Sequence, residues 1–95
     1  MADFIFLMHD DAPDAVADWG PYLAQLQAKG VLQGGSRISG GTCVRKSGTA
    51  HSITSHLGGF IRVEATDFDD ARTLIAGNPV YEAGGTIEIR ELPRD

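Results

Sequence analysis

The stretch Ser55–Pro93, SHLGGFIRVEATDFDDARTLIAGNPVYEAGGTIEIRELP, carries the clearest structural signal in this chain. It reads as a strand, a helix and a second strand, with a stop signal after each. Residues 56–65 alternate along a strand, with Leu57, Gly59, Ile61, Val63 and Ala65 on one face and Gly58, Phe60, Arg62 and Glu64 on the other. Residues 85–92 alternate in the same way, with Ile87 and Ile89 opposite Thr86, Glu88 and Arg90. An apolar row backed by a row of mixed charges predicts an antiparallel sheet with helices on one face.

The segment between these strands predicts a helix at about residues 67–77. Asp67 and Asp70 approximate a capping box in which Asp replaces Glu, and acidic residues in the first turn favour the helix dipole. Gly77-Asn78 can adopt a positive φ at the helix end, and Pro79 prevents the helix from continuing. The apolar face is spaced at three and four residues and comprises Phe68, Ala71, Leu74 and Ile75.

The first half of the chain repeats the strand–helix theme. The apolar run Phe4–Met8 is typical of a central strand buried on both faces. Asp10-Asp11-Ala12-Pro13 then predicts a helix start, and Lys29-Gly30 predicts its end. Because Gly20-Pro21 interrupts this pattern, we expect a kink or two shorter helical pieces. The expected buried stripe is Val16, Trp19, Leu23 and Leu26, with Tyr22 at its margin.

The element order predicts an α+β fold of ferredoxin-like βαββαβ type over one domain, residues 1–95. Its antiparallel sheet carries both helices on one face. Val31-Leu32-Gln33 begins the second strand, and Thr42–Lys46 is expected to be an extra short strand. A small sheet of this kind leaves its second face uncovered. We therefore expect an isologous homodimer through the face that carries Phe60, Arg62, Glu88 and Arg90.

Composition and charge exclude several classes of binding partner for this protein. The formal net charge of −5 argues against nucleic acid, which requires a basic face. A lone cysteine, Cys43, excludes an internal disulfide and fits the reducing cytoplasm. No apolar run approaches the roughly 18 residues that span a bilayer, and no basic segment precedes residues 3–9, so we expect neither membrane insertion nor a secretory signal. The chain shows no metal-ligand spacing and no cofactor motif, and we expect neither a metal nor a cofactor.

Four fragments in order resemble the YCII-related, or DGPF-type, domain family: QLQAKGVLQGG (Gln25–Gly35), LGGF (Leu57–Phe60), ATDFDDA (Ala65–Ala71) and NPVYEAGGTIEIREL (Asn78–Leu92). The resemblance implies a dimeric α+β barrel with a pocket between sheet and helices near the dimer interface. It implies no assigned reaction. The Asp-Gly-Pro-Phe motif is missing, because residues 47–55 read SGTAHSITS and contain no acidic residue. Small members of the family carry a His–Asp pair, and His9-Asp10 is its nearest counterpart here.

The candidate catalytic residues are His9, Asp10 and His56. A carboxylate can orient an imidazole for general base catalysis. Adjacent strand residues point to opposite faces, however, and Asp10 alternatively begins a helix cap. Because the first and third strands of a ferredoxin-like sheet are neighbours, residues 9 and 56 should lie at the same sheet edge. The alternative is two surface histidines at strand ends.

The candidate ligand-binding residues are Ser36, Arg37, Arg45, Gly58, Gly59 and Tyr81. Gly34-Gly35-Ser36-Arg37 could bind an anion through backbone amides and the guanidinium, or form a β-bulge. Arg45 is either an ion-pair partner or an anion clamp, and Tyr81 could present its hydroxyl from a loop. Gly58 and Gly59 permit close approach by a ligand, or accommodate Trp19 or Tyr22. His51 is expected to be solvated.

Three functions fit these features. The first is a cofactor-free enzyme that performs acid/base chemistry on a small organic molecule, which could be an anion. The second is a module that binds the same ligand without turnover. The third is a dimerising accessory domain with a vestigial pocket. Fold alone does not separate them.

Overall fold

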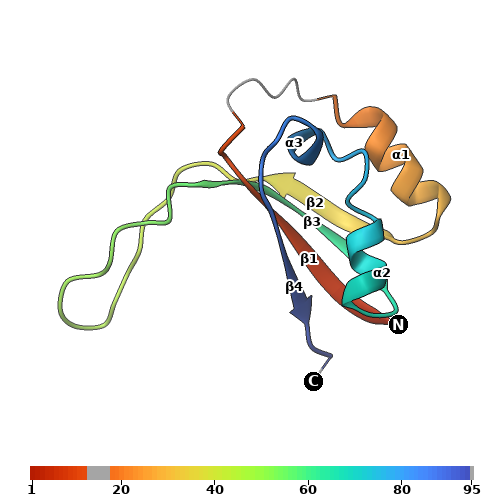
Figure 1. Cartoon of the computed structure of the whole chain (residues 1–95). Coiled ribbons are helices and arrows are strands. Elements are labelled where there is room, and N and C mark those ends of the chain that lie inside the picture. Colours follow the sequence, from red (N-terminus) through yellow and green to blue (C-terminus); the bar gives the residue numbers. More distant parts are fainter. Residues whose placement is uncertain (13–17, 95) are drawn as a thin grey trace.

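A computed structural model describes residues 1–12 and 18–94. Figure 1 shows the helices gathered on one face of a single sheet. The strands lie in the order β2-β3-β1-β4, and every neighbouring pair is antiparallel. This arrangement confirms the predicted ferredoxin-like fold. The elements are β1 (Ala2–His9), α1 (Gly20–Ala28), β2 (Leu32–Arg37), β3 (Leu57–Ala65), α2 (Phe68–Thr73), α3 (Pro79–Glu82) and β4 (Ile87–Leu92).

The core lies between the sheet and the helices. Alternation along β1 places Phe4, Phe6 and Met8 under the helices, where all three are buried. Burying a side chain of this size contributes about 1.5–3 kcal/mol. Ile5 and Leu7 point to the other face and are only half-buried, so the expectation that this strand is buried on both faces is wrong for a single chain. The remaining core residues are Tyr22, Leu26, Ile61, Val63, Ala65, Ala71, Leu74 and Ile75.

Helix α1 covers the described part of the first predicted helix. It begins at Gly20, which places Pro21 in the first turn, where the missing N–H costs nothing. The predicted start at Pro13 and the predicted core residue Val16 lie outside the described residues. Tyr22 is a core residue and not a marginal one, because its ring is 2% exposed and its hydroxyl donates to the Leu74 carbonyl at 2.7 Å.

The predicted helix at residues 67–77 is shorter in the structure: α2 spans Phe68–Thr73, and a separate helix, α3, follows at Pro79–Glu82. Asp67 caps α2 by accepting from the Asp70 amide at 2.8 Å, while the Asp70 carboxylate accepts from the Thr66 amide at 2.9 Å. The helix ends near Leu74, and Gly77 has the expected positive φ of 90°. Asn78 then caps α3, since its Oδ1 accepts from the Val80 and Tyr81 amides. Pro79 therefore begins a new helix after the old one has stopped.

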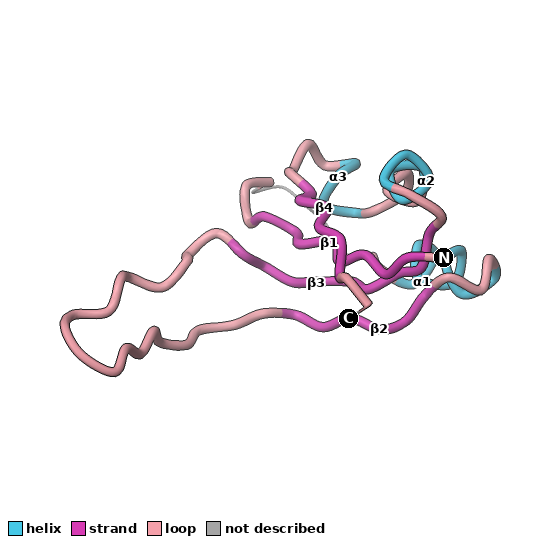
Figure 2. Tube along the Cα trace, turned by 90° about the horizontal axis from the view of Figure 1, so that it is seen from below, coloured by secondary structure: helices cyan, strands magenta, loops and turns pink. Residues whose placement is uncertain are grey.

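Residues 38–56, which we term the arm, protrude from the sheet between β2 and β3 (Figures 1 and 2). The predicted extra strand at Thr42–Lys46 is wrong, because these residues pair with no other strand. The expected bulge is present in β2. Its pairing register with β3 shifts between Leu32 and Gly34, and Gly34 adopts a φ of 143°.

None of the helices in residues 1–12 and 18–94 has the length and apolarity that a membrane-spanning helix needs.

Candidate functional site

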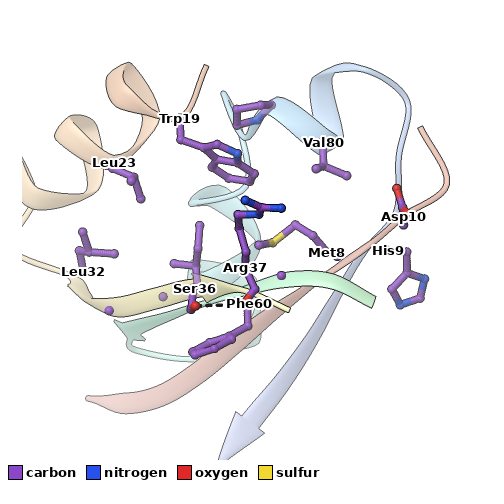
Figure 3. A pocket seen from close by; sticks show the side chains of 16 residues that line it. Met8, His9, Asp10, Trp19, Leu23, Leu32, Ser36, Arg37, Phe60 and Val80 are labelled. Carbon is purple, nitrogen blue, oxygen red and sulfur yellow. Dashed lines mark hydrogen bonds between the residues drawn. The ribbon is translucent and has the colours of Figure 1, made fainter. Parts of the chain in front are cut away.

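A cleft of about 800 Å³ lies between the helix-covered face of the sheet and the starts of α1 and α3. Its volume falls within the range of small-molecule sites. Most of its walls are apolar, and Figure 3 shows Trp19, Leu23 and Val80 above the sheet with Met8 below them. The lining residues are Met8, His9, Asp10, Trp19, Leu23, Leu32, Gly34, Gly35, Ser36, Arg37, Gly58, Gly59, Phe60, Ile61, Pro79 and Val80.

Two ionisable side chains face this apolar cleft. Arg37, the last residue of β2, points from the sheet toward the helices, and Asp10 lies at the β1 end (Figure 3). Within the described chain, no carboxylate lies within ion-pair distance of Arg37, and the Asp10 carboxylate accepts no hydrogen bond. Both groups are therefore available to a ligand.

The neighbouring carboxylate, Asp11, is already engaged. Its oxygens accept from the Thr86 amide at 2.9 Å and from the Thr86 hydroxyl at 2.6 Å. The hydroxyl hydrogen bond, reinforced by the amide, lowers the pKa of Asp11. These contacts join the end of β1 to the start of β4. Together with the hydrogen bond from the Asp10 amide to the His56 carbonyl, they hold the backbone of Asp10 in place.

Close approach of the β2 backbone explains why residue 59 is a glycine, but it does not explain Gly58. A Cβ on Gly59 would lie 3.0 Å from the Ser36 carbonyl oxygen, so the β2 backbone approaches this residue closely. A Cβ on Gly58 would meet nothing nearer than 3.8 Å, and neither glycine has Trp19 or Tyr22 among its nearest atoms. Both glycines line the cleft. The tightest approach in this strand pair is at Gly35, where a Cβ would lie 2.6 Å from the Phe60 carbonyl oxygen.

The two histidines come together, as the strand pairing predicts. The His9 and His56 rings meet edge to face, with centroids 4.7 Å apart and an interplanar angle of 71°. His9 Nε2 lies 3.0 Å from Glu88 Oε1, and Glu88 Oε2 accepts from Arg90 Nε at 2.7 Å. The Arg90 hydrogen bond, followed by the His9 contact, lowers the pKa of Glu88. Glu88 is therefore a carboxylate that orients the His9 ring.

This histidine pair does not share a site with Arg37. His9 borders the cleft, but its ring points away from the helices, to the opposite side of the sheet from the Arg37 side chain (Figure 3). The His9 imidazole and the Arg37 guanidinium therefore do not face one common ligand. The cause is strand alternation, which sends residue 9 to one face and Asp10 to the other.

The other predicted ligand residues divide between the cleft and the surface. Ser36 lines the cleft, but its hydroxyl donates to the Arg37 carbonyl at 2.9 Å. Arg45 lies in the arm, where Nη1 donates to the Thr49 carbonyl at 3.4 Å. Tyr81 belongs to α3 and not to a loop, and it lines a separate depression with Asp69 and Arg72. Neither Arg45 nor Tyr81 reaches the cleft. His51 is exposed, as expected.

Two residues of the site were missed from the sequence. Trp19 was assigned to the core, yet it is half-buried and lines the cleft. The feature of the sequence that could have placed Trp19 at the cleft is its position just before Gly20-Pro21, where a helix begins. Glu88 was assigned to the sheet face without a role. Its contact with His9 follows from the β1–β4 register, which pairs Glu88 with Leu7. In the described residues, no cluster of three His, Cys, Asp or Glu side chains is arranged to hold a metal ion.

Comparison with known proteins identifies the family. The sequence profile of the YCII-related domain matches residues 5–94. The chain belongs to the YCII-related family. Among solved structures, it is similar to 5-chloro-2-hydroxyhydroquinone dehydrochlorinase from Burkholderia phenoliruptrix AC1100, determined in complex with 2,5-dihydroxybenzoquinone. The TM-score is 0.61 at 20% sequence identity, over 98% of this chain and 95% of the dehydrochlorinase. This likeness supports the shared fold. No curated protein sequence matches the chain.

Proposed function

We propose that this YCII-related protein binds a small, ring-shaped organic anion in the cleft and transfers a proton to or from it through Asp10. The observation that carries the proposal is an apolar cleft with two unengaged ionisable groups, Arg37 and Asp10. An apolar site with a few polar groups is the usual form of a small-molecule site. A guanidinium pairs well with carboxylates and other oxyanions.

The cleft walls favour a planar ligand. Trp19 offers a flat aromatic surface from the helix side, and Gly59 leaves one position of the sheet side without a side chain. The dehydrochlorinase of similar fold was determined with 2,5-dihydroxybenzoquinone, which is a planar hydroxylated ring. Hydroxylated ring compounds are therefore the first ligands to test.

The residues divide the proposed work. Arg37 holds the anionic group through a charge-assisted hydrogen bond. Asp10 accepts or returns a proton at the β1 end of the cleft. The His9 ring lies on the other side of the sheet, and the backbone carbonyl of His56 accepts from the Asp10 amide and so holds the backbone of Asp10.

The alternative is a module that binds the same ligand without turnover. One observation favours it: the imidazole of His9, the expected acid/base, points out of the cleft. Asp10 is then the only carboxylate among the lining residues. The two functions share a ligand and differ only in whether it is converted.

Ligand screening followed by a conversion assay separates these functions. A thermal-shift screen of hydroxylated benzoquinones, phenols and benzoates should reveal a compound that raises the melting temperature. NMR of that compound in D2O with catalytic protein should then show deuterium exchange or product formation. Asp10→Asn should retain binding and slow conversion by about 100-fold or more. Binding without any conversion would support the non-catalytic module, and no binding by any compound would contradict both functions.

A further inference from the structure

The arm, residues 38–56, has the properties of a segment that needs a partner. Loops longer than about 12–15 residues without secondary structure are uncommon in compact domains and are usually functional. Residues 39–55 make no backbone-to-backbone hydrogen bond within the described chain. Their only hydrogen bond is the one from Arg45 to Thr49. Figure 2 shows the arm extending away from the rest of the protein. Intramolecular contacts therefore do not account for its extended path.

The arm also exposes apolar side chains that a solvated loop does not require. Val44 is 86% exposed and Ile53 is 44% exposed, which makes them two of the five large exposed apolar residues of the described chain. Burying these side chains on a partner removes apolar surface from water, which favours association.

The charge of the arm is opposite to that of the rest of the protein. The arm contains Arg45 and Lys46 and no acidic residue. All 13 acidic residues of the chain therefore lie outside it, although the whole chain carries a net charge of −5. A basic arm on an acidic protein is complementary to another molecule of the same protein.

We propose that the arm is an intersubunit element that lies on the body of a second copy of this chain, with each copy engaging the other reciprocally. The arm leaves the sheet at the edge of the cleft, since Arg37 precedes it and Gly58 follows it closely. This proposal does not depend on the reaction proposed above.

Cys43 allows the contact to be mapped without a mutation. It is the only cysteine, it is exposed, and it lies in the arm beside Val44. Protein that carries benzophenone maleimide on Cys43 is mixed with 15N-enriched protein that carries no benzophenone. The mixture is equilibrated at about 20 μM and irradiated. The proposal predicts cross-links from the arm to 15N peptides outside residues 38–56. Cross-links confined to the labelled chain would overturn it.

Charge and apolar variants test the forces involved. In sedimentation velocity, Arg45→Glu/Lys46→Glu should weaken dimerisation by tenfold or more at 50 mM salt, with a smaller effect at 500 mM. Val44→Asp/Ile53→Asp should weaken it at both salt concentrations. The control, Lys29→Glu/Arg72→Glu, makes the same charge change at exposed residues outside the arm and should leave dimerisation unchanged. Circular dichroism of each variant checks folding. A wild-type monomer at 100 μM, or arm variants that dimerise like the control, would contradict the proposal.

Discussion

Gly59 shows how a single residue shapes both the sheet and the cleft. It lies opposite Arg37 in the β2–β3 pairing and lacks the Cβ that would contact the Ser36 carbonyl at 3.0 Å. The β2 backbone can therefore approach β3, and the cleft floor carries no side chain at this one position. Gly58, its neighbour, has ordinary clearance.

Gly59→Val should therefore destabilise the protein more than Gly58→Val does. Overpacking against backbone costs about 1–3 kcal/mol, because the Ser36 carbonyl cannot rotate away as a side chain can. Urea unfolding followed by circular dichroism measures the difference, with Gly58→Ala as the conservative control. Equal unfolding midpoints for the two valine variants would show that the close approach at Gly59 has no energetic consequence.

Tyr22 illustrates a buried polar group with a pH signature. Burial raises the pKa of Tyr22 to about 12. The unfolded chain ionises near the ordinary value of about 10. The folded protein keeps the neutral phenol in this interval, so stability should fall as the pH rises from about 10 toward 12. Tyr81, the other tyrosine, is 51% exposed.

Tyr22→Phe should remove much of this alkaline loss of stability. At neutral pH it should cost about 1–3 kcal/mol, since the buried Leu74 carbonyl loses its donor. Urea unfolding of wild type and variant between pH 8 and 11 tests both expectations, with Tyr81→Phe as the control. Parallel stability curves for wild type and Tyr22→Phe would contradict the assignment.

At the scale of elements, the α2 cap is a sequence signal that the structure reproduces directly. Asp67 accepts from the Asp70 amide, as the capping pattern predicts. Asp67→Ala should therefore cost about 0.5–2 kcal/mol of unfolding free energy. Asp69→Ala is the matched control, because it removes a carboxylate from the same turn but no capping contact. The cap assignment fails if urea unfolding gives both variants the same stability.

The same scale shows what sequence patterns could and could not predict. Alternation in β3 was sufficient to assign its faces, because burial along this strand follows period two. The helix at 67–77 was placed correctly at its start and incorrectly at its end. Local signals do not reveal that Asn78 and Pro79 start a second helix. The strand at Thr42–Lys46 was assigned from local composition, whereas a strand also needs a partner that sequence does not supply.

The candidate site was predictable only in part for a related reason. Strand order placed His9 beside His56, and the Gly-rich segment pointed to Arg37. The direction of each side chain depends on register, however, and a shift between Met8 and His9 in the β1–β3 pairing falls at this point. The assignment of Trp19 to the cleft depends on where α1 begins. Gly20-Pro21 indicated an interruption of the helix at this point but did not show that the helix starts there.

At the scale of the whole molecule, the uncovered sheet face predicts a dimer. The face carries Phe60 with Arg62, Glu88 and Arg90, next to the half-buried Ile5 and Leu7. Covering it with the same face of a second copy would bury these apolar side chains. Sedimentation equilibrium should show a dimer at micromolar concentration, and Phe60→Glu should convert it to a folded monomer. A monomeric wild type would contradict this expectation, as would a dimer insensitive to the substitution.

The most direct test of the proposed cleft uses Trp19, the only tryptophan of the chain and a residue of the cleft wall. Its fluorescence is followed while a hydroxylated ring anion, beginning with 2,5-dihydroxybenzoquinone, is added to wild type, Arg37→Gln and the surface control Arg72→Gln. We predict a saturable change in wild type and control. The dissociation constant should be at least tenfold higher in Arg37→Gln, since hydrogen bonds to charged groups contribute about 1.5–3 kcal/mol. A fluorescence change that does not saturate, or an affinity unaffected by Arg37→Gln, would contradict the assignment of this cleft as an anion-binding site.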